Sequence, residues 1–191
     1  IMFGSSRCRR FVNCWFSRVA TLYRCDADGG NIRMISSNND HDNTPWVLPD
    51  GRVLYMRWEY VDRSQVHFHH LWTVNPDGAG QMTWYGNEFA GTAMLDAKPI
   101  PGTNKVVASF SPGHGAPEHM GRITIVDPSA GPDVLPVTKQ ISKGNQMFRD
   151  PYAINEDCFL AADSKGIFVI DGDGNKELVY ALPEALRHME C

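Results

Sequence analysis

The stretch Leu71-Trp-Thr-Val-Asn-Pro-Asp-Gly78 is a short β-rich run that ends in a tight turn. Three further stretches have the same form: Leu22-Tyr-Arg-Cys-Asp-Ala-Asp-Gly29, Ile123-Thr-Ile-Val-Asp-Pro-Ser-Ala130 and Ile167-Phe-Val-Ile-Asp-Gly-Asp-Gly174. The four stretches begin 49, 52 and 44 residues apart. A repeat of roughly 40 to 50 residues with several strands per unit is typical of β-propeller blades. The repeat therefore predicts an all-β chain built from such blades.

Each complete unit contains four short strand patterns separated by turn residues, as in Pro49-Asp-Gly-Arg52. Proline fixes φ in such a turn and glycine accepts a positive φ. Four antiparallel strands joined in this way make one blade. The expected strands are 44–49, 53–60, 70–75 and 81–85 in the second unit; 97–101, 105–110, 122–127 and 134–138 in the third; and 151–154, 158–163, 166–171 and 177–181 in the fourth.

The first unit has strand patterns at 1–5, 22–26 and 32–36 but none for an innermost strand. We therefore expect a β-propeller segment of about four blades with the first incomplete, divided at 1–37, 38–87, 88–140 and 141–182, and a tail or short helix at 183–191. Open sheet edges are a liability, so we expect this segment to belong to a larger propeller. The alternative is a four-bladed ring in which the other terminus supplies the missing strand. The helical pattern of the tail argues against it.

The composition limits the classes of partner. The chain has 191 residues, 42% of them hydrophobic and 21% charged, as in an ordinary globular protein, and its net charge is −4. No basic field is present to hold nucleic acid, and no apolar run reaches the ~20 residues that cross a bilayer. The expected partners are other domains of the same polypeptide or another protein.

The sequence lacks several signatures of catalysis. It contains no Gly-x-Ser-x-Gly elbow, no His-Glu-x-x-His, no phosphate-binding loop and no dinucleotide fingerprint. Its five cysteines form no Cys-x-x-Cys pair, and Cys8 and Cys14 are equally suited to a disulfide or to free thiols. The Asp-x-Asp-Gly turns are expected from turn chemistry alone. We therefore expect no catalytic residue and no cofactor in this segment.

Histidines gather in the long links. Links between the second and third strands of meandering blades emerge on one face of a propeller, and here they are long at 6–21, 61–69 and 111–121. Loops of this length are more often functional than short ones. Five of the seven histidines lie in or beside two of these links, and a sixth lies in a blade crossing on the same face; these are His67, His69, His70, His114, His119 and His41.

Two candidate sites follow from this face. His67 and His69 point to one side of an extended chain, so with His114 or His119 they could bind a transition metal, or they could hydrogen-bond the loop backbone. In the stretch Arg57-Trp-Glu-Tyr-Val-Asp-Arg63, strand alternation places the Arg57 and Glu59 side chains on the same face of the strand. The two side chains could form a buried ion pair or could contact a ligand. A ligand or partner face is therefore expected at Arg57, Glu59, Asp62, Arg63 and His41.

Several strings also resemble known families. The repeat of TolB-like propellers, which are periplasmic interaction modules, resembles two successive stretches of this chain. They are Leu22 to Arg33 and Pro45-Trp-Val-Leu-Pro-Asp-Gly-Arg52. More of the chain resembles the middle domain of the hydrazine synthase alpha subunit and its relatives in large secreted bacterial proteins. The strings are Asp50-Gly-Arg-Val-Leu-Tyr-Met-Arg-Trp-Glu-Tyr-Val-Asp62, Asn75-Pro-Asp-Gly78, Tyr85-Gly-Asn87, Ala97-Lys-Pro-Ile-Pro-Gly102 and Gly113-His-Gly115.

That resemblance implies a propeller whose haem chemistry belongs to other domains, and a secreted or periplasmic location. It favours a noncatalytic scaffold or binding module of a larger protein. The alternative is a component of a metal- or haem-dependent oxidoreductase whose site lies on the histidine-rich face. Relatives tend to have two histidines where this chain has only His114 between Gly113 and Gly115.

Overall fold

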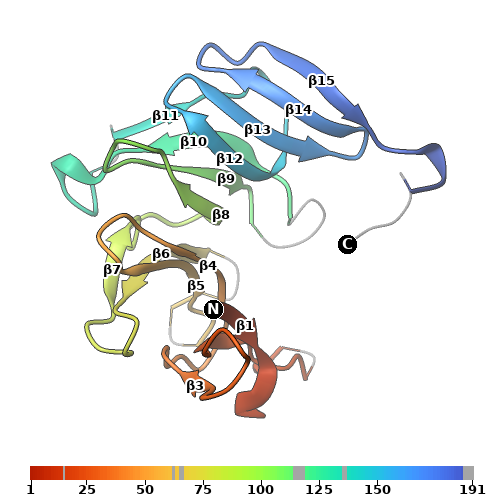
Figure 1. Cartoon of the computed structure of the whole chain (residues 1–191). Coiled ribbons are helices and arrows are strands. Elements are labelled where there is room, and N and C mark those ends of the chain that lie inside the picture. Colours follow the sequence, from red (N-terminus) through yellow and green to blue (C-terminus); the bar gives the residue numbers. More distant parts are fainter. Residues whose placement is uncertain (15, 62, 65–66, 114–118, 135–136, 187–191) are drawn as a thin grey trace.

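The computed structural model describes residues 1–14, 16–61, 63–64, 67–113, 119–134 and 137–186. Its strands form successive antiparallel meanders, which we call blades 1 to 4, arranged as an open arc (Figure 1). The blades consist of β1 (Met2–Ser5), β2 (Thr21–Arg24) and β3 (Arg33–Met34); β4 (Asp42–Val47), β5 (Val53–Trp58), β6 (Phe68–Val74) and β7 (Met82–Tyr85); β8 (Thr92–Pro99), β9 (Val106–Ser111), β10 (Arg122–Val126) and β11 (Thr138–Gln140); and β12 (Arg149–Asn155), β13 (Cys158–Asp163), β14 (Gly166–Asp171) and β15 (Lys176–Ala181). The predicted all-β, partial propeller is confirmed.

Helical structure among the described residues is limited to short 3₁₀ turns. These are η1 (Ser6–Cys8), η2 (Pro128–Ala130) and η4 (Glu184–Leu186), the last within the predicted tail. No helix in the described part of the chain is long and apolar enough to span a bilayer.

The innermost strands differ most from the prediction. β8 begins at Thr92, five residues before the expected start at 97, and β4 begins at Asp42. The early part of β8 is extended because it pairs with two strands at once. Ala93 lies opposite Ser111 of β9 and also beside His69 of β6, in a short parallel ladder that joins blades 2 and 3. Outer strand β11 instead begins late, at Thr138, and part of its predicted range lies outside the described residues.

Side-chain hydrogen bonds organise the Asp-containing turns. The Asp50 carboxylate accepts the Arg52 backbone N–H at 3.0 Å, and Asp77 accepts that of Ala79 at 2.9 Å. Asp171 accepts the N–H groups of both Asp173 and Asn175. These contacts are the Asx turns that the turn sequences predict.

Equivalent apolar positions pack each blade against the next. The strand registers place three sets of residues at matching points of blades 2, 3 and 4: Leu48, Ile100 and Ile154; Leu71, Ile123 and Ile167; Tyr85, Ile141 and Tyr180. In blades 2 and 3 these side chains are at most 7% exposed, because the following blade covers them. In blade 4 the same positions are 42% to 53% exposed. One face of blade 4 is thus built like a blade interface but is uncovered.

Gly121 joins blades 3 and 4 and lies close to the backbone of β9. Its backbone exchanges two hydrogen bonds with Phe148, at 3.0 and 2.8 Å, where the chain enters blade 4. A Cβ atom at Gly121 would lie 2.3 Å from the carbonyl carbon of Phe110. Backbone atoms cannot move aside as a flexible side chain does.

We predict that Gly121→Ala lowers the free energy of unfolding by more than about 2 kcal/mol, because the ladder to Phe148 must shift. Gly4→Ala is the matched control, since an added Cβ there meets nothing within 4 Å. Urea unfolding followed by tryptophan fluorescence measures both. Equal stability of the two variants would contradict this account of Gly121.

Candidate functional site

The links of the first two blades meet around Trp58 at the end of β5. The link from blade 1 folds back as a hairpin, in which Val12 N–H donates to Ser17 O at 2.8 Å and Val19 N–H to Arg10 O at 2.9 Å. Val12 and Val19 are buried against Met56 and Trp58 and against the first residues of β8. The link of blade 1 is therefore packed against the end of β5 and the start of β8.

Two of the predicted histidines lie on either side of Trp58. The ring centroids of His41 and Trp58 are 5.5 Å apart with an interplanar angle of 4°, and those of Trp58 and His69 are 5.3 Å apart at 12°. Tyr60 meets the edge of the same indole. The Ala20 N–H donates to His41 Nδ1 at 3.0 Å, which fixes that nitrogen as an acceptor. These contacts give both imidazoles a packing role.

A cavity of about 330 Å³ lies beside this stack. Its volume is in the range of small-molecule sites. The polar lining comes from separate elements: Asn43 and Thr44 of β4, His69 of β6, Asp96 of β8, and His119 of the link after β9. Two of the four predicted metal ligands, His69 and His119, thus share one cavity. His67 is exposed and does not line it, and His114 lies outside the described residues.

The pKa of the Asp96 carboxyl is shifted in this cavity. Burial raises the pKa of the Asp96 carboxyl, and the nearby Asp150 carboxylate acts in the same direction. Lys98 and His119 partly offset the shift. His70, next to the lining His69, is 1% exposed, and burial lowers its pKa to about 4, so it is neutral at physiological pH.

Arg57 and Glu59 each pair with a residue other than the partner that strand alternation suggested. The Arg57 guanidinium lies 4.0 Å from the buried Asp42, donates to Ser37 O at 3.1 Å, and stacks over Trp72 at 4.6 Å. The suggested Arg57–Glu59 pair is replaced because β4 places Asp42 directly opposite Arg57. Arg57 thereby helps to hold blade 2 together.

Glu59 instead forms an ion pair with Arg63 at 2.6 Å. Arg63 also donates to the side chain and carbonyl of Asn87, each at 2.7 Å, and lies 3.9 Å from the Phe68 ring centroid. Arg63 therefore fastens the β5–β6 link to the end of blade 2. Asp62, the remaining member of the predicted face, lies outside the described residues.

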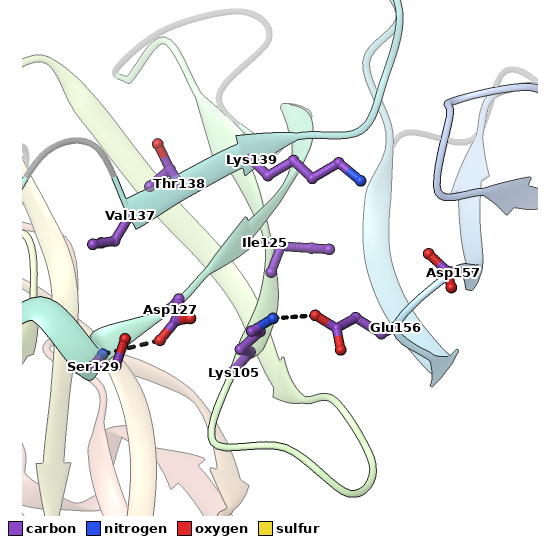
Figure 2. A pocket seen from close by; sticks show the side chains of 9 residues that line it. All are labelled: Lys105, Ile125, Asp127, Ser129, Val137, Thr138, Lys139, Glu156 and Asp157. Carbon is purple, nitrogen blue, oxygen red and sulfur yellow. Dashed lines mark hydrogen bonds and ion pairs between the residues drawn. The ribbon is translucent and has the colours of Figure 1, made fainter.

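A second cavity, of about 420 Å³, lies between blades 3 and 4 at the opposite ends of the strands (Figure 2). Lys105 of the β8–β9 turn pairs with Glu156 of the β12–β13 turn across it. The hydrogen bond that Lys105 donates to Glu156 raises the pKa of Lys105, and desolvation partly offsets this effect. In Figure 2, Lys139 lies above this pair and Asp157 lies beyond Glu156. The ion pair joins two neighbouring blades, which is a structural role.

Sequence reasoning missed the residues of the innermost strands. Asp42, Thr44 and Asp96 were not singled out, although each precedes a small or proline residue near the start of an inner strand. The repeated placement of these polar residues ahead of each blade's first turn was the available signal. Its meaning depends on strand pairing, which the sequence pattern alone does not specify.

These observations define an open β-propeller segment with a histidine-lined cavity on its long-link face. No known family model and no curated protein matches the chain. Among solved structures it is similar to Kuenenia stuttgartiensis hydrazine synthase, with 21% identity over 88% of this chain and a TM-score of 0.72. A Mycobacterium tuberculosis puromycin-hydrolysing peptidase matches 86% of this chain at 11% identity, and the TM-score of 0.43 is too low to establish a shared fold.

The first match confirms, for the fold, the expected resemblance to a hydrazine synthase propeller domain. The chain spans 26% of the length of that hydrazine synthase chain. The TolB-like resemblance stays a prediction.

The pH dependence of stability tests the environment of Asp42. Burial raises the pKa of Asp42 to about 6, against the opposing effect of Arg57, whereas the carboxyl in the unfolded chain has its ordinary pKa of 3.8. Between pH 3.8 and about pH 6 the folded chain therefore binds more protons than the unfolded chain. The stability that Asp42 contributes in its protonated form is lost as the pH rises through about 6.

We predict that the stability of Asp42→Asn, measured relative to wild type, increases by up to about 3 kcal/mol between pH 4 and pH 7, because the variant no longer ionises at this position. Urea unfolding at several pH values measures the difference. A constant difference across this range would show that Asp42 is not held in its neutral form.

Proposed function

We propose that this chain is a noncatalytic β-propeller scaffold or binding module of a larger secreted or periplasmic protein. The observation that carries the proposal is the uncovered face of blade 4, where Ile154, Ile167 and Tyr180 repeat an interface pattern that is buried in blades 2 and 3. Large uncovered apolar faces mark sites of interaction. A further sheet of the same polypeptide is the occupant we propose. The likeness to a region of the longer hydrazine synthase chain supports it.

The long-link face is the second surface in this proposal. Its predicted binding residues are largely engaged with one another: Arg63 with Glu59 and Asn87, His41 with Trp58 and Ala20. Such a surface is rigid before a partner arrives, and preorganisation favours binding. A secreted or periplasmic location follows from the family resemblance.

The covering sheet can be tested with matched substitutions. In the isolated 191 residues we predict that Ile167→Thr changes the free energy of unfolding by less than about 1 kcal/mol, because Ile167 is 42% exposed. Leu71→Thr at the equivalent point of blade 2 should cost about 3 kcal/mol, because Leu71 is buried.

The same pair is then compared in the longer protein. There, Ile167→Thr should become nearly as destabilising as Leu71→Thr, because another sheet covers it. If Ile167→Thr remained harmless in the longer protein, the proposed covering sheet would be wrong.

The second candidate is a metal- or haem-dependent oxidoreductase component with its site on the long-link face. The observation that favours it is the shared cavity of His69 and His119, with Asp96 also in the lining. Among the described residues, no three His, Cys, Asp or Glu side chains form a group that could hold an ion. The set would be completed by His114 or by a neighbouring domain.

Elemental analysis separates the two candidates. The scaffold proposal predicts less than about 0.1 metal ion per chain after dialysis, both in wild type and in the double variant His69→Ala with His119→Ala. His67→Ala is the control, because His67 does not line the cavity. Stoichiometric metal that is lost only in the double variant would establish the second candidate instead.

A further inference from the structure

The innermost strands of blades 2, 3 and 4 share an unusual backbone feature. Each strand contains a shift of the pairing register, between Asn43 and Trp46, between Leu95 and Lys98, and between Arg149 and Tyr152. The residue that directly follows the first residue of each shift has a positive φ: 52° at Thr44, 54° at Asp96 and 48° at Asp150. Left-handed backbone at residues other than glycine is uncommon and costs free energy. The same bulge is thus built three times.

These bulges bring chemically different side chains to one place. β4 packs beside β8, and β8 beside β12 (Figure 1). The bulge residues Thr44, Asp96 and Asp150 line a cavity of about 210 Å³, together with Trp46 and Lys98, which end the bulges of blades 2 and 3. We call it the inner-strand cavity. It shares Thr44 and Asp96 with the larger histidine-lined cavity, so the two adjoin.

Aromatic surface is available in the inner-strand cavity. Trp46 is 38% exposed, and Tyr152, at the matching point of blade 4, is 48% exposed. Their rings meet edge to face with centroids 6.2 Å apart. Aromatic rings on an otherwise polar wall provide flat apolar surface for a ligand.

The charges beside these rings exclude several classes of ligand. Lys98 Nζ lies 5.4 Å from the Trp46 ring centroid and 3.5 Å from Asp150 Oδ1. A cationic ligand would be repelled by the Lys98 ammonium group beside this ring. An anion would meet two carboxylates, Asp96 and Asp150, and a wholly apolar ligand would bury the ion pair without compensation.

A neutral ligand with many hydroxyl groups satisfies all of these constraints. A hydroxyl both donates and accepts, so neighbouring hydroxyls can bond Lys98 Nζ and Asp150 Oδ1 at once. The C–H face of a pyranose ring is flat and apolar and suits Trp46. The Asp96 carboxyl, which also lines this cavity, can accept a hydrogen bond from a ligand hydroxyl.

We propose that the inner-strand cavity is a binding site for a neutral pyranose sugar, with Trp46 as the stacking surface and Lys98 and Asp150 as the hydroxyl-binding pair. This ligand site goes beyond the proposed scaffold role. It requires no partner protein and no metal.

Nuclear magnetic resonance titration of the 191-residue chain tests the proposal. The probes are the methyl β-glycosides of glucose and galactose, methyl α-mannoside and N-acetylglucosamine, with choline, citrate and cyclohexanol as the cationic, anionic and apolar comparisons. At least one sugar should shift the Trp46 indole N–H signal with a dissociation constant of about 1 mM, and the three comparison compounds should not.

Three variants then assign the site. Trp46→Ala and Asp150→Asn should each weaken sugar binding at least about tenfold. Tyr180→Ala, which removes an exposed aromatic side chain from β15, should leave binding within about twofold. Asp150→Asn keeps the test valid if Trp46→Ala folds poorly, because Asp150 is 73% exposed.

The proposal is overturned if none of the sugars shifts the Trp46 signal, or if choline, citrate or cyclohexanol binds there instead. Equal effects of Tyr180→Ala and of the two cavity variants would overturn it as well.

Discussion

Burial of apolar side chains between neighbouring blades is the constraint on which the rest of the structure depends. Blade 2 is apolar on both faces: Val53 and Val74 pack toward blade 1, and Leu54 and Leu71 toward blade 3. A four-stranded sheet with two apolar faces is stable only when both are covered. This requirement orders the blades into an arc and brings the long links of successive blades to one face. The cavities therefore follow from the packing of the sheets.

On that face, polar groups are buried at positions where the fold supplies partners. The Asn38 side-chain amide donates to the carbonyls of His41 and Trp58 and to Asp42, at 3.0 to 3.2 Å. One asparagine thus connects the crossing from blade 1 with the end of β5. Buried polar groups are tolerated only when they are bonded, so this network fixes where His41 and Trp58 lie. The aromatic stack beside the histidine-lined cavity depends on it.

The sequence predicted the sheets well and the sites only in part. Strand alternation and turn residues located β5, β13 and β14 closely, because each begins directly after a turn whose chemistry is local. Topology placed the links that carry His69 and His119 on one face, and the structure shows that both residues line one cavity. The partner of Arg57 did not, because Asp42 reaches it through the register of β4, which begins before the expected strand. The bulges at Thr44 and Asp96 escaped for the same reason: their conformation is imposed by pairing with the next strand.

Backbone and side chains vary independently along the innermost strands. Thr44, Asp96 and Asp150 share one left-handed conformation, although only aspartate among them is favoured there. A strain of about 1 to 3 kcal/mol at each site persists only where the surrounding sheet determines it. The residues that end the bulges differ completely: Trp46, Lys98 and Tyr152. Strand pairing sets the bulge in all three blades. The side chains that end the bulges can therefore differ from blade to blade while the backbone stays the same.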